Sequence, residues 1–424
     1  MKKIILGLCL TASFSYGLTI EDAVKTAIEN NPSIKQQIIQ QEISHHKTKE
    51  INANRFGKID AFVNYTHYNF PRLVAPISPP LNQAAIAGIV GAKNITIPGI
   101  RYDVPLFTGF KIEKGVEISK LGEKLSEVAV NLTKNQIAFN VRSIYLKILT
   151  LKKQLEAMEH YKKALDQLYD NISMLYELGK KPEVDLLKVE YAKKTVESNI
   201  EAINNAIDTL KETLRTLMNI EDKDFKVEPI SFRGIGNVSK EELMKVYFPK
   251  LYSVKKVEIQ KQISQKKLEQ SKSDYYPNLF FSGQYQRNIG NGENKELWQV
   301  SLIARYTIFD FGNRYNKKIE SELNFKKTLL EEQRVKLDVE RKLTDALNQI
   351  KTADFKIKAT KKQLDYATEV EKVEKLKYEE GVSSLYDYLY AQSQKYIAES
   401  KYYEALYDKQ RAIYYLDYVL EKGF

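Results

Sequence analysis

The chain has 424 residues, with 66 Lys and Arg against 55 Asp and Glu, and a formal net charge of +11. The basic residues are spread along the chain among nearly as many acids, which argues against a nucleic-acid-binding surface. The one cysteine, Cys9, lies in the leader described below, so we expect a mature chain without disulfides or cysteine-ligated metal. No set of nucleophile, base and acid residues is recognisable. We therefore expect neither an enzyme nor a protein with a metal or another cofactor.

The N-terminus predicts a secretory signal peptide over residues 1–17. Two lysines follow Met1, the apolar run 4–10 comes next, and small residues lie near Gly17. The apolar run is too short to span a bilayer, and no later segment has about 18 consecutive apolar residues. Leu8 stands where a lipoprotein signal carries a small residue before its cysteine, so we expect no lipid anchor.

Two short motifs occur twice along the chain. The stretch "PLFTGF" at 105–110 is echoed by "TIFDFG" at 307–312, and "YELGKKPEVD" at 176–185 by "YEEGVSSLYD" at 378–387. Phe107 and Phe309 differ by 202 in residue number, and so do Gly179 and Gly381. This shared offset predicts a duplicated unit. We place the first repeat at 18–220, a linker or equatorial segment at 221–238 and the second repeat at 239–424.

Each repeat is predicted to contain a short helix, two strands, a very long helix, a glycine turn and a second short helix. Thr19 is expected to cap the first helix with Asp22 in its first turn, and Pro32 to break or kink it. Apolar residues recur at threes and fours over 111–178, as in a coiled coil, and predict a helix about 100 Å long. The short helices 19–54 and 182–219 are expected to run beside it, and 239–275 and 384–421 beside a long helix at 314–379.

Four segments alternate between apolar and polar residues, near Ile59–Thr66, Ile100–Leu106, Leu279–Gln286 and Trp298–Ile308. Runs of about 10 residues with aromatic residues near their ends are typical of outer-membrane barrel strands, and Trp298 is a candidate membrane-interface aromatic. A half-buried sheet in a soluble protein is the alternative. The charge-free stretch from Leu73 to Ala92 lies between the first two strands, and we interpret it as an external loop that narrows the outer mouth.

Four strands cannot close a barrel, and open edges are not tolerated in lipid, so the chain must oligomerise. Two copies supply eight strands and three copies supply twelve. Since about eight strands leave a lumen filled by side chains, a conduit favours the trimer. The expected fold is thus an α+β membrane protein, a trimeric channel-tunnel. Four strands from each chain contribute to a shared 12-stranded barrel, and long coiled-coil helices form a periplasmic α-barrel.

These features together resemble the outer membrane efflux protein family, the TolC-like channel-tunnels. The N-terminal "LTIEDAVKTAIENNP" and the Tyr-x-x-Gly-x-x-x-x-x-Asp tips are two carriers of the resemblance. The strand-to-helix motif is the third, and its residues are Pro105, Leu106, Phe107 and Gly109 in the first repeat and Phe309, Asp310 and Gly312 in the second. The resemblance implies a homotrimer in outer-membrane lipid, with a tunnel through the periplasm.

The two tips contain the candidate functional residues. Gly179 and Gly381 are expected to end the long helices in the left-handed conformation. Pro182 is expected at the first position of one return helix and Ser383 at the cap of the other. Asp185 and Asp387 then fall in the first turns of these helices, near the positive ends of their dipoles.

The resemblance assigns roles to several tip residues. It implies a ring of acids at Asp387 in the trimer, and a latch in which Tyr378 bonds across to Asp185. The family's second acid is replaced by Tyr390, and its latching Arg by Ser383. The same turns resemble the family's adaptor-docking surface, whose residues here are Gly179, Gly381, Leu178, Lys180, Val382 and Ser383.

The sequence therefore predicts a passive exit duct for a tripartite efflux pump or a type I secretion system, gated at the tips. Implied partners are a periplasmic adaptor protein and an inner-membrane pump of the RND, ABC or MFS type. The expected location is the cell outer membrane, with a periplasmic extension. The alternative is a non-conducting coiled-coil spacer or adhesin of the envelope, with its strands packed as a soluble sheet.

Overall fold

The computed structural model describes residues 17–77, 89–222, 225–236 and 238–422. These residues form two compact units. One unit contains Met1–Ile38, Val128–Lys255 and Arg334–Phe424, and the other contains Ile39–Glu127 and Lys256–Gln333. Each unit takes residues from both sequence repeats. Residues 1–16 of the expected leader and residues 78–88 of the expected external loop lie outside the described residues.

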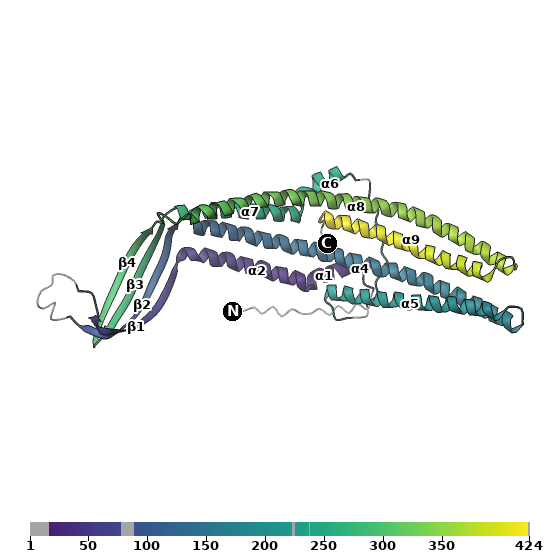
Figure 1. Ribbon diagram of the computed structural model, residues 1–424, viewed down its shortest axis with the longest axis horizontal. Helices are drawn as coiled ribbons and strands as arrows, with labels where there is room; N and C mark the ends of the chain where they lie inside the picture. Colours follow the sequence, from purple (N-terminus) through teal and green to yellow (C-terminus); the bar gives the residue numbers. More distant parts are fainter. Residues whose placement is uncertain (1–16, 78–88, 223–224, 237, 423–424) are drawn as a thin grey trace. The chain divides into compact units, whose positions relative to one another are not determined.

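The unit formed by residues 39–127 and 256–333 contains a four-stranded antiparallel sheet. Its strands are β1 (Lys58–Leu73), β2 (Gly91–Thr108), β3 (Asn278–Gly290) and β4 (Glu293–Arg305). They pair in the order β1-β2-β3-β4, so β1 and β4 are the edges (Figure 1). The strands have 13–18 residues, longer than the predicted runs of about 10. The prediction for β4 was also wrong at its end, because the strand stops at Arg305 and not at Ile308.

The register of the sheet places the predicted apolar residues of all four strands on one face. One row across the sheet is Ala61, Ile100, Tyr285 and Trp298. The next row lies on the opposite face and is Asp60, Arg101, Gln284 and Gln299. Trp298 is 77% exposed and Ile100 is 55% exposed. The alternation read from the sequence is confirmed, and the apolar face is uncovered in the single chain.

Each hairpin ends in a turn of two left-handed residues that leads into a long helix. These residues are Gly109 and Phe110 in the first repeat (φ 61° and 67°), and Phe311 and Gly312 in the second (φ 54° and 84°). Only one residue of each pair is glycine, although this region favours glycine. The duplicated strand-to-helix motif thus encodes the same backbone turn twice.

The helical part of this unit consists of segments of α2 (Pro32–Ala53), α4 (Lys111–Glu177), α7 (Tyr252–Ser271) and α8 (Asn313–Glu379). Polar contacts join α4 to α7: Lys114 Nζ lies 2.7 Å from a Glu269 oxygen, and Lys266 Nζ lies 2.8 Å from a Glu117 oxygen. Side-chain hydrogen bonds from Lys266 and Lys114 hold the pKa of Glu117 below its usual value. Within the described residues, Val116 and Val257 are the buried apolar side chains of these helix segments.

The other unit is helical. It contains α1 (Ile20–Asn30), α5 (Glu183–Met218), α6 (Lys240–Tyr247) and α9 (Leu385–Val419), with parts of α2, α4, α7 and α8. The Thr19 cap is confirmed, since its hydroxyl accepts a bond from the Asp22 backbone N–H at 3.1 Å. The break at Pro32 is confirmed. The expected helix 239–275 is also broken, by a 3-10 turn at Phe248–Lys250 that contains Pro249.

Three apolar clusters hold this helical unit together. The first joins α1, α4 and α5 around the fully buried Tyr145, whose hydroxyl donates to the Leu18 carbonyl at 2.7 Å. The second joins α4, α5 and α9 near the tips, around Leu165. The third joins α6, α8 and α9 around Leu343. Within the described residues, no helix is both long and apolar enough to cross a membrane.

Candidate functional site: the two helix tips

The first tip is the turn between α4 and α5, and it ends α4 with a Schellman motif. Gly179 has φ 70°, its N–H donates to the Tyr176 carbonyl at 2.9 Å, and the Lys180 N–H donates to the Leu175 carbonyl at 2.8 Å. This pair of bonds satisfies carbonyls that the helix end would otherwise leave free. The predicted left-handed cap at Gly179 is confirmed.

The second tip repeats this geometry between α8 and α9. Gly381 has φ 75°, its N–H donates to the Tyr378 carbonyl at 3.1 Å, and the Val382 N–H donates to the Lys377 carbonyl at 2.8 Å. The duplication is therefore preserved at the level of individual hydrogen bonds. Two backbone hydrogen bonds fix the conformation of each turn, and with it the positions from which the side chains project.

The caps of the two return helices differ from the prediction by one residue each. Pro182 is the cap of α5, with ψ 151°, and Glu183 is the first helical residue. Ser384, and not Ser383, caps α9: its Oγ accepts from the Asp387 N–H at 3.2 Å and donates to Asp387 Oδ2 at 2.6 Å. Because Asp387 closes this reciprocal pair, its carboxylate is held beside the first turn of α9 while it stays exposed to solvent.

Tyr378 connects the two tips. The Lys181 Nζ of the first tip lies 4.8 Å from the centre of its ring, within the range of a cation–π contact. The same ring stacks on Tyr388 of α9, with 5.7 Å between centroids. Burial raises the pKa of Tyr388 to about 12, and repulsion from Glu371 and Glu379 adds to the shift. Tyr378 therefore contacts both a cation of the first tip and a buried aromatic ring.

Asp185 has a different local partner in the single chain. Its Oδ1 lies 3.3 Å from Nζ of Lys188, one turn along α5, and its side chain is only 15% exposed. Tyr378 contacts Lys181 instead, so the structure brings the expected latch residues to the same pair of tips without joining them directly.

Glu374 is a tip residue that the sequence analysis missed. Its carboxylate accepts hydrogen bonds from Lys377 Nζ at 2.7 Å and from Ser383 Oγ at 2.8 Å, and both bonds lower its pKa. Ser383 is thus engaged with α8, nine residues away in sequence. Spacing on one helix predicts the pair with Lys377, but the pair with Ser383 depends on how the turn closes.

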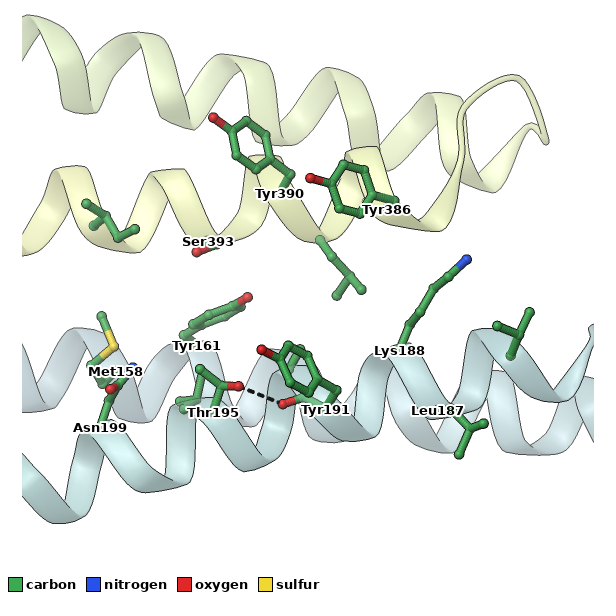
Figure 2. Close-up of a pocket in the computed structure, with 15 residues that line it drawn as sticks. Met158, Tyr161, Leu187, Lys188, Tyr191, Thr195, Asn199, Tyr386, Tyr390 and Ser393 are labelled. Carbon is green, nitrogen blue, oxygen red and sulfur yellow. Dashed lines mark hydrogen bonds between the residues drawn. The ribbon is translucent and has the colours of Figure 1, made fainter.

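A groove of about 650 Å³ lies beside the tips, between α9 on one side and α4 and α5 on the other (Figure 2). Tyr386 and Tyr390 line it from α9, and Tyr191 and Lys188 line it from α5. Tyr386 and Tyr390 stack with 6.4 Å between centroids. Tyrosine rings thus line both sides of the groove, next to the turns.

The residues expected to dock a partner form an exposed rim around the turns. Val382 is 78% exposed and Leu178 is 61% exposed, and Lys180 is exposed as well. Apolar side chains presented by tightly hydrogen-bonded turns suit recognition by another protein. Within the described residues, no three metal-ligating side chains gather closely enough to hold a metal ion.

Comparison with known proteins gives a family and a fold. Residues 252–420 match the family model described as outer membrane efflux protein. No curated protein matches the chain. The resemblance inferred from the sequence is confirmed for this part of the chain.

Solved outer-membrane channels share the fold over nearly the whole chain. The Campylobacter jejuni CmeC outer membrane channel has a TM-score of 0.80 at 15% identity, and the alignment covers 96% of this chain and 86% of that chain. The outer membrane protein VceC of Vibrio cholerae has a TM-score of 0.77 at 11% identity, with 96% of each chain covered. The Neisseria gonorrhoeae MtrE outer membrane channel, solved in its open state, has a TM-score of 0.74 at 13% identity, with 95% and 88% covered.

Proposed function

We propose that this chain, whose residues 252–420 carry an outer membrane efflux protein domain, is an outer-membrane channel. It gives a passive exit route to the substrates of a tripartite efflux pump or a type I secretion system, and it catalyses no reaction. The observation that carries this proposal is the sheet, whose apolar face is uncovered and whose two edge strands are unpaired in the single chain. In a bilayer, lipid covers such a face. The sheet is stable there only when its edge strands are paired, because lipid offers no hydrogen bonds to their backbone groups.

The channel is a homotrimer in the outer membrane. Three copies supply twelve strands, enough to enclose an open lumen. The helices support assembly as well, since every buried residue of α8 lies at or beyond Val339, and its first 26 residues have none. Neighbouring copies cover these uncovered helix faces and complete a periplasmic tunnel.

The tips face the periplasm and meet a periplasmic adaptor, which joins the channel to an inner-membrane pump of the RND, ABC or MFS type. The exposed rim at Leu178, Lys180 and Val382 is the docking surface, together with the turns at Gly179, Gly381 and Ser383. Its apolar side chains lie on two rigid turns, which lowers the entropy cost of docking.

The same tips form the gate. Tyr378 and Asp185 are the latch of the closed state, and in the single chain Lys181 and Tyr388 hold Tyr378 near the first tip. The hydroxyl of Tyr378 donates to Asp185 when the tips close. Asp387, exposed at the start of α9, forms the selectivity ring around the threefold axis.

Conductance of the purified channel in planar bilayers tests both proposals. Channel activity with steps that depend on salt concentration is expected, whereas a spacer or adhesin conducts nothing and needs no detergent. Tyr378→Phe removes only the hydroxyl, so the latch predicts higher conductance for Tyr378→Phe and for Asp185→Asn. If only Tyr378→Ala raises conductance, ring stacking closes the tip and the proposed hydrogen bond is wrong.

A further inference from the structure

The two hairpins of the sheet correspond strand by strand, since β1 begins at Lys58 and β3 begins at Asn278, 220 residues later. Lys58 pairs with Asp103 in the first hairpin, and Asn278 pairs with Arg305 in the second. These pairs correspond when β3 is matched to β1 by an offset of 220 residues and β4 to β2 by the repeat offset of 202. The match extends along the hairpin, because Ile59 with Tyr102 corresponds to Leu279 with Ala304 in the same way.

One feature of the first hairpin has no counterpart in the second. Strand β2 continues to Thr108, five residues past its last pair with β1, because β3 is hydrogen-bonded to its other side. Strand β4 stops at Arg305, where its pairing with β3 ends. The equivalent five residues, 306–310, therefore lack the neighbouring strand that holds 104–108 in place.

Exposure of the side chains supports this comparison. Val104 and Phe107 of β2 are half-buried. Their counterparts by the repeat offset are Tyr306, 53% exposed, and Phe309, 70% exposed. Ile308 between them is 85% exposed. Strand β1, on the opposite edge of the sheet, is likewise unpaired on its outer side.

We infer that β4 and residues 306–310 pair with β1 of a second copy of this chain, in a register set by the duplication. The inference rests on the proposed function and specifies which residues meet at the joint between copies. The β2–β3 register supplies it: Gly99 opposite Gln286 becomes Ser301 opposite Thr66 of the second copy. In the β2–β3 pair, the numbers of two opposite residues add to 385. Adding 202 for β4 and subtracting 220 for β1 gives 367, so the numbers of opposite residues in the new strand pair add to 367.

The faces of the two edges agree in this register. Ile100 opposite Tyr285 becomes Leu302 opposite Tyr65 of the second copy. Leu302 is 71% exposed and Tyr65 is 66% exposed, and both lie on the apolar face of the sheet. A slip by one residue would place each apolar side chain opposite a polar one.

The charges of the two edges agree as well. The β2–β3 register shifts by one residue after Pro105, where Thr108 lies opposite Asn278. Carried over, this pair becomes Asp310 opposite Lys58 of the second copy. Arg305, five residues earlier, comes to lie diagonally across from Asp60 of that copy. Opposite charges at neighbouring cross-strand positions stabilise a pairing.

The symmetry ends at the turn after residue 310. Gly109 allows a close approach in the first repeat, because a Cβ there would lie 2.3 Å from the Ser273 carbonyl oxygen. Its counterpart is Phe311, so the turn before β1 of the second copy cannot come as close. Phe110 and Phe107 cluster with Tyr276 in the first repeat. The counterpart of Tyr276 by the offset of 220 is Phe56, so Phe56 of the second copy packs against the exposed Phe309 and Phe311.

Four cysteine pairs test the register. The only cysteine of the chain lies in residues 1–16, so the mature protein supplies no competing thiol if the leader is cleaved. The four proteins combine Ser301→Cys or Ile303→Cys with Asn64→Cys or Thr66→Cys. Directly opposite residues have Cα atoms about 4.5–5.5 Å apart, within disulfide reach, whereas a shift of two residues separates them by about 8 Å.

The pairs 301 with 66 and 303 with 64 are expected to give covalent oligomers on non-reducing gels after mild oxidation. The pairs 301 with 64 and 303 with 66 contain the same four substitutions and are expected to give at least tenfold less. Equal or reversed yields, or no cross-link from any pair, would overturn the register. Conductance of the reduced proteins is measured in parallel: a conducting channel with the wrong cross-links refutes only the register, and a protein that neither conducts nor cross-links refutes the proposed function as well.

Discussion

Gly179 and Gly381 show what a single residue determines in this protein. Both have a left-handed backbone, and a Cβ added at either would meet nothing within 4 Å. The cost of replacing them by alanine is therefore the backbone strain alone, about 1–2 kcal/mol at each site. Gly122, within α4, also has open space around it but does not have a positive φ, so alanine there is expected to stabilise the helix by about 0.5–1 kcal/mol.

Thermal unfolding followed by circular dichroism checks this difference. Gly179→Ala and Gly381→Ala are expected to lower the unfolding midpoint, and Gly122→Ala to raise it slightly. Equal shifts for all three variants would mean that the left-handed turns contribute nothing particular to stability.

The Glu374 carboxylate makes the second tip sensitive to pH. Hydrogen bonds from Lys377 and Ser383 lower its pKa, while the charge of Asp387 opposes them. Because its pKa is lowered, the ionised Glu374 stabilises the folded tip at every pH above its ordinary pKa of 4.5. This stabilisation is lost as the pH falls through the lowered pKa that Glu374 has in the folded tip. Glu374→Gln is therefore expected to speed amide exchange at Gly381 at pH 7, with the difference from wild type disappearing once the pH falls below the lowered pKa of Glu374.

Glu380→Gln is the control, since Glu380 lies in the same turn with an exposed side chain. It is expected to leave the exchange rate at Gly381 close to that of wild type at every pH. An effect of Glu374→Gln that persists in acid would show that the shape of the side chain matters there, and not its charge.

At the scale of the element, the fluorescence of a single tryptophan reports whether the sheet faces lipid. Trp298 is the one tryptophan of the chain, and it projects from the apolar face of β4. In reconstituted protein we expect its emission at short wavelength, quenched by lipids with brominated chains and little affected by acrylamide in water. Tyrosine background is removed by comparison with Trp298→Phe. Quenching by acrylamide alone would mean that the sheet does not face lipid.

The helices and strands also differ in how well the sequence predicts their ends. The alternation from Trp298 to Ile308 is real in the sequence, yet β4 stops at Arg305 because a strand needs a neighbour and the single chain has none there. Helix breaks are easier to predict, because proline acts on its own backbone. Pro32 was recognised in this role, and Pro249 acts in the same way at the corresponding place in the second repeat.

At the scale of the whole molecule, the charge of the proposed gate depends on the proposed trimer. One Asp387 is an ordinary exposed acid in the first turn of α9. Three around an axis would attract cations into the aperture and repel anions. Asp387→Asn is therefore expected to reduce the preference for cations, seen as a shift of the reversal potential towards zero in a salt gradient.

Asp208→Asn is the matched control, because Asp208 is 75% exposed on α5 and lies far along the chain from either tip. It is expected to leave the reversal potential unchanged. Equal effects of the two substitutions would indicate that overall charge, and not a ring at Asp387, sets the selectivity.

The sequence by itself determined the features that depend on a residue and its near neighbours. Thr19, Gly179, Gly381 and Pro32 act on the local backbone, and strand alternation follows from the two faces of an extended chain. The two glycine turns that end the long helices were therefore predicted correctly, whereas the roles of the tip residues stay predictions. Only the tertiary structure decided the contacts made through space, such as Lys181 with Tyr378 and Glu374 with Ser383. The tertiary structure also decided where β4 ends. A strand forms only beside a neighbouring strand that offers hydrogen bonds, and the local sequence does not show where such a neighbour lies.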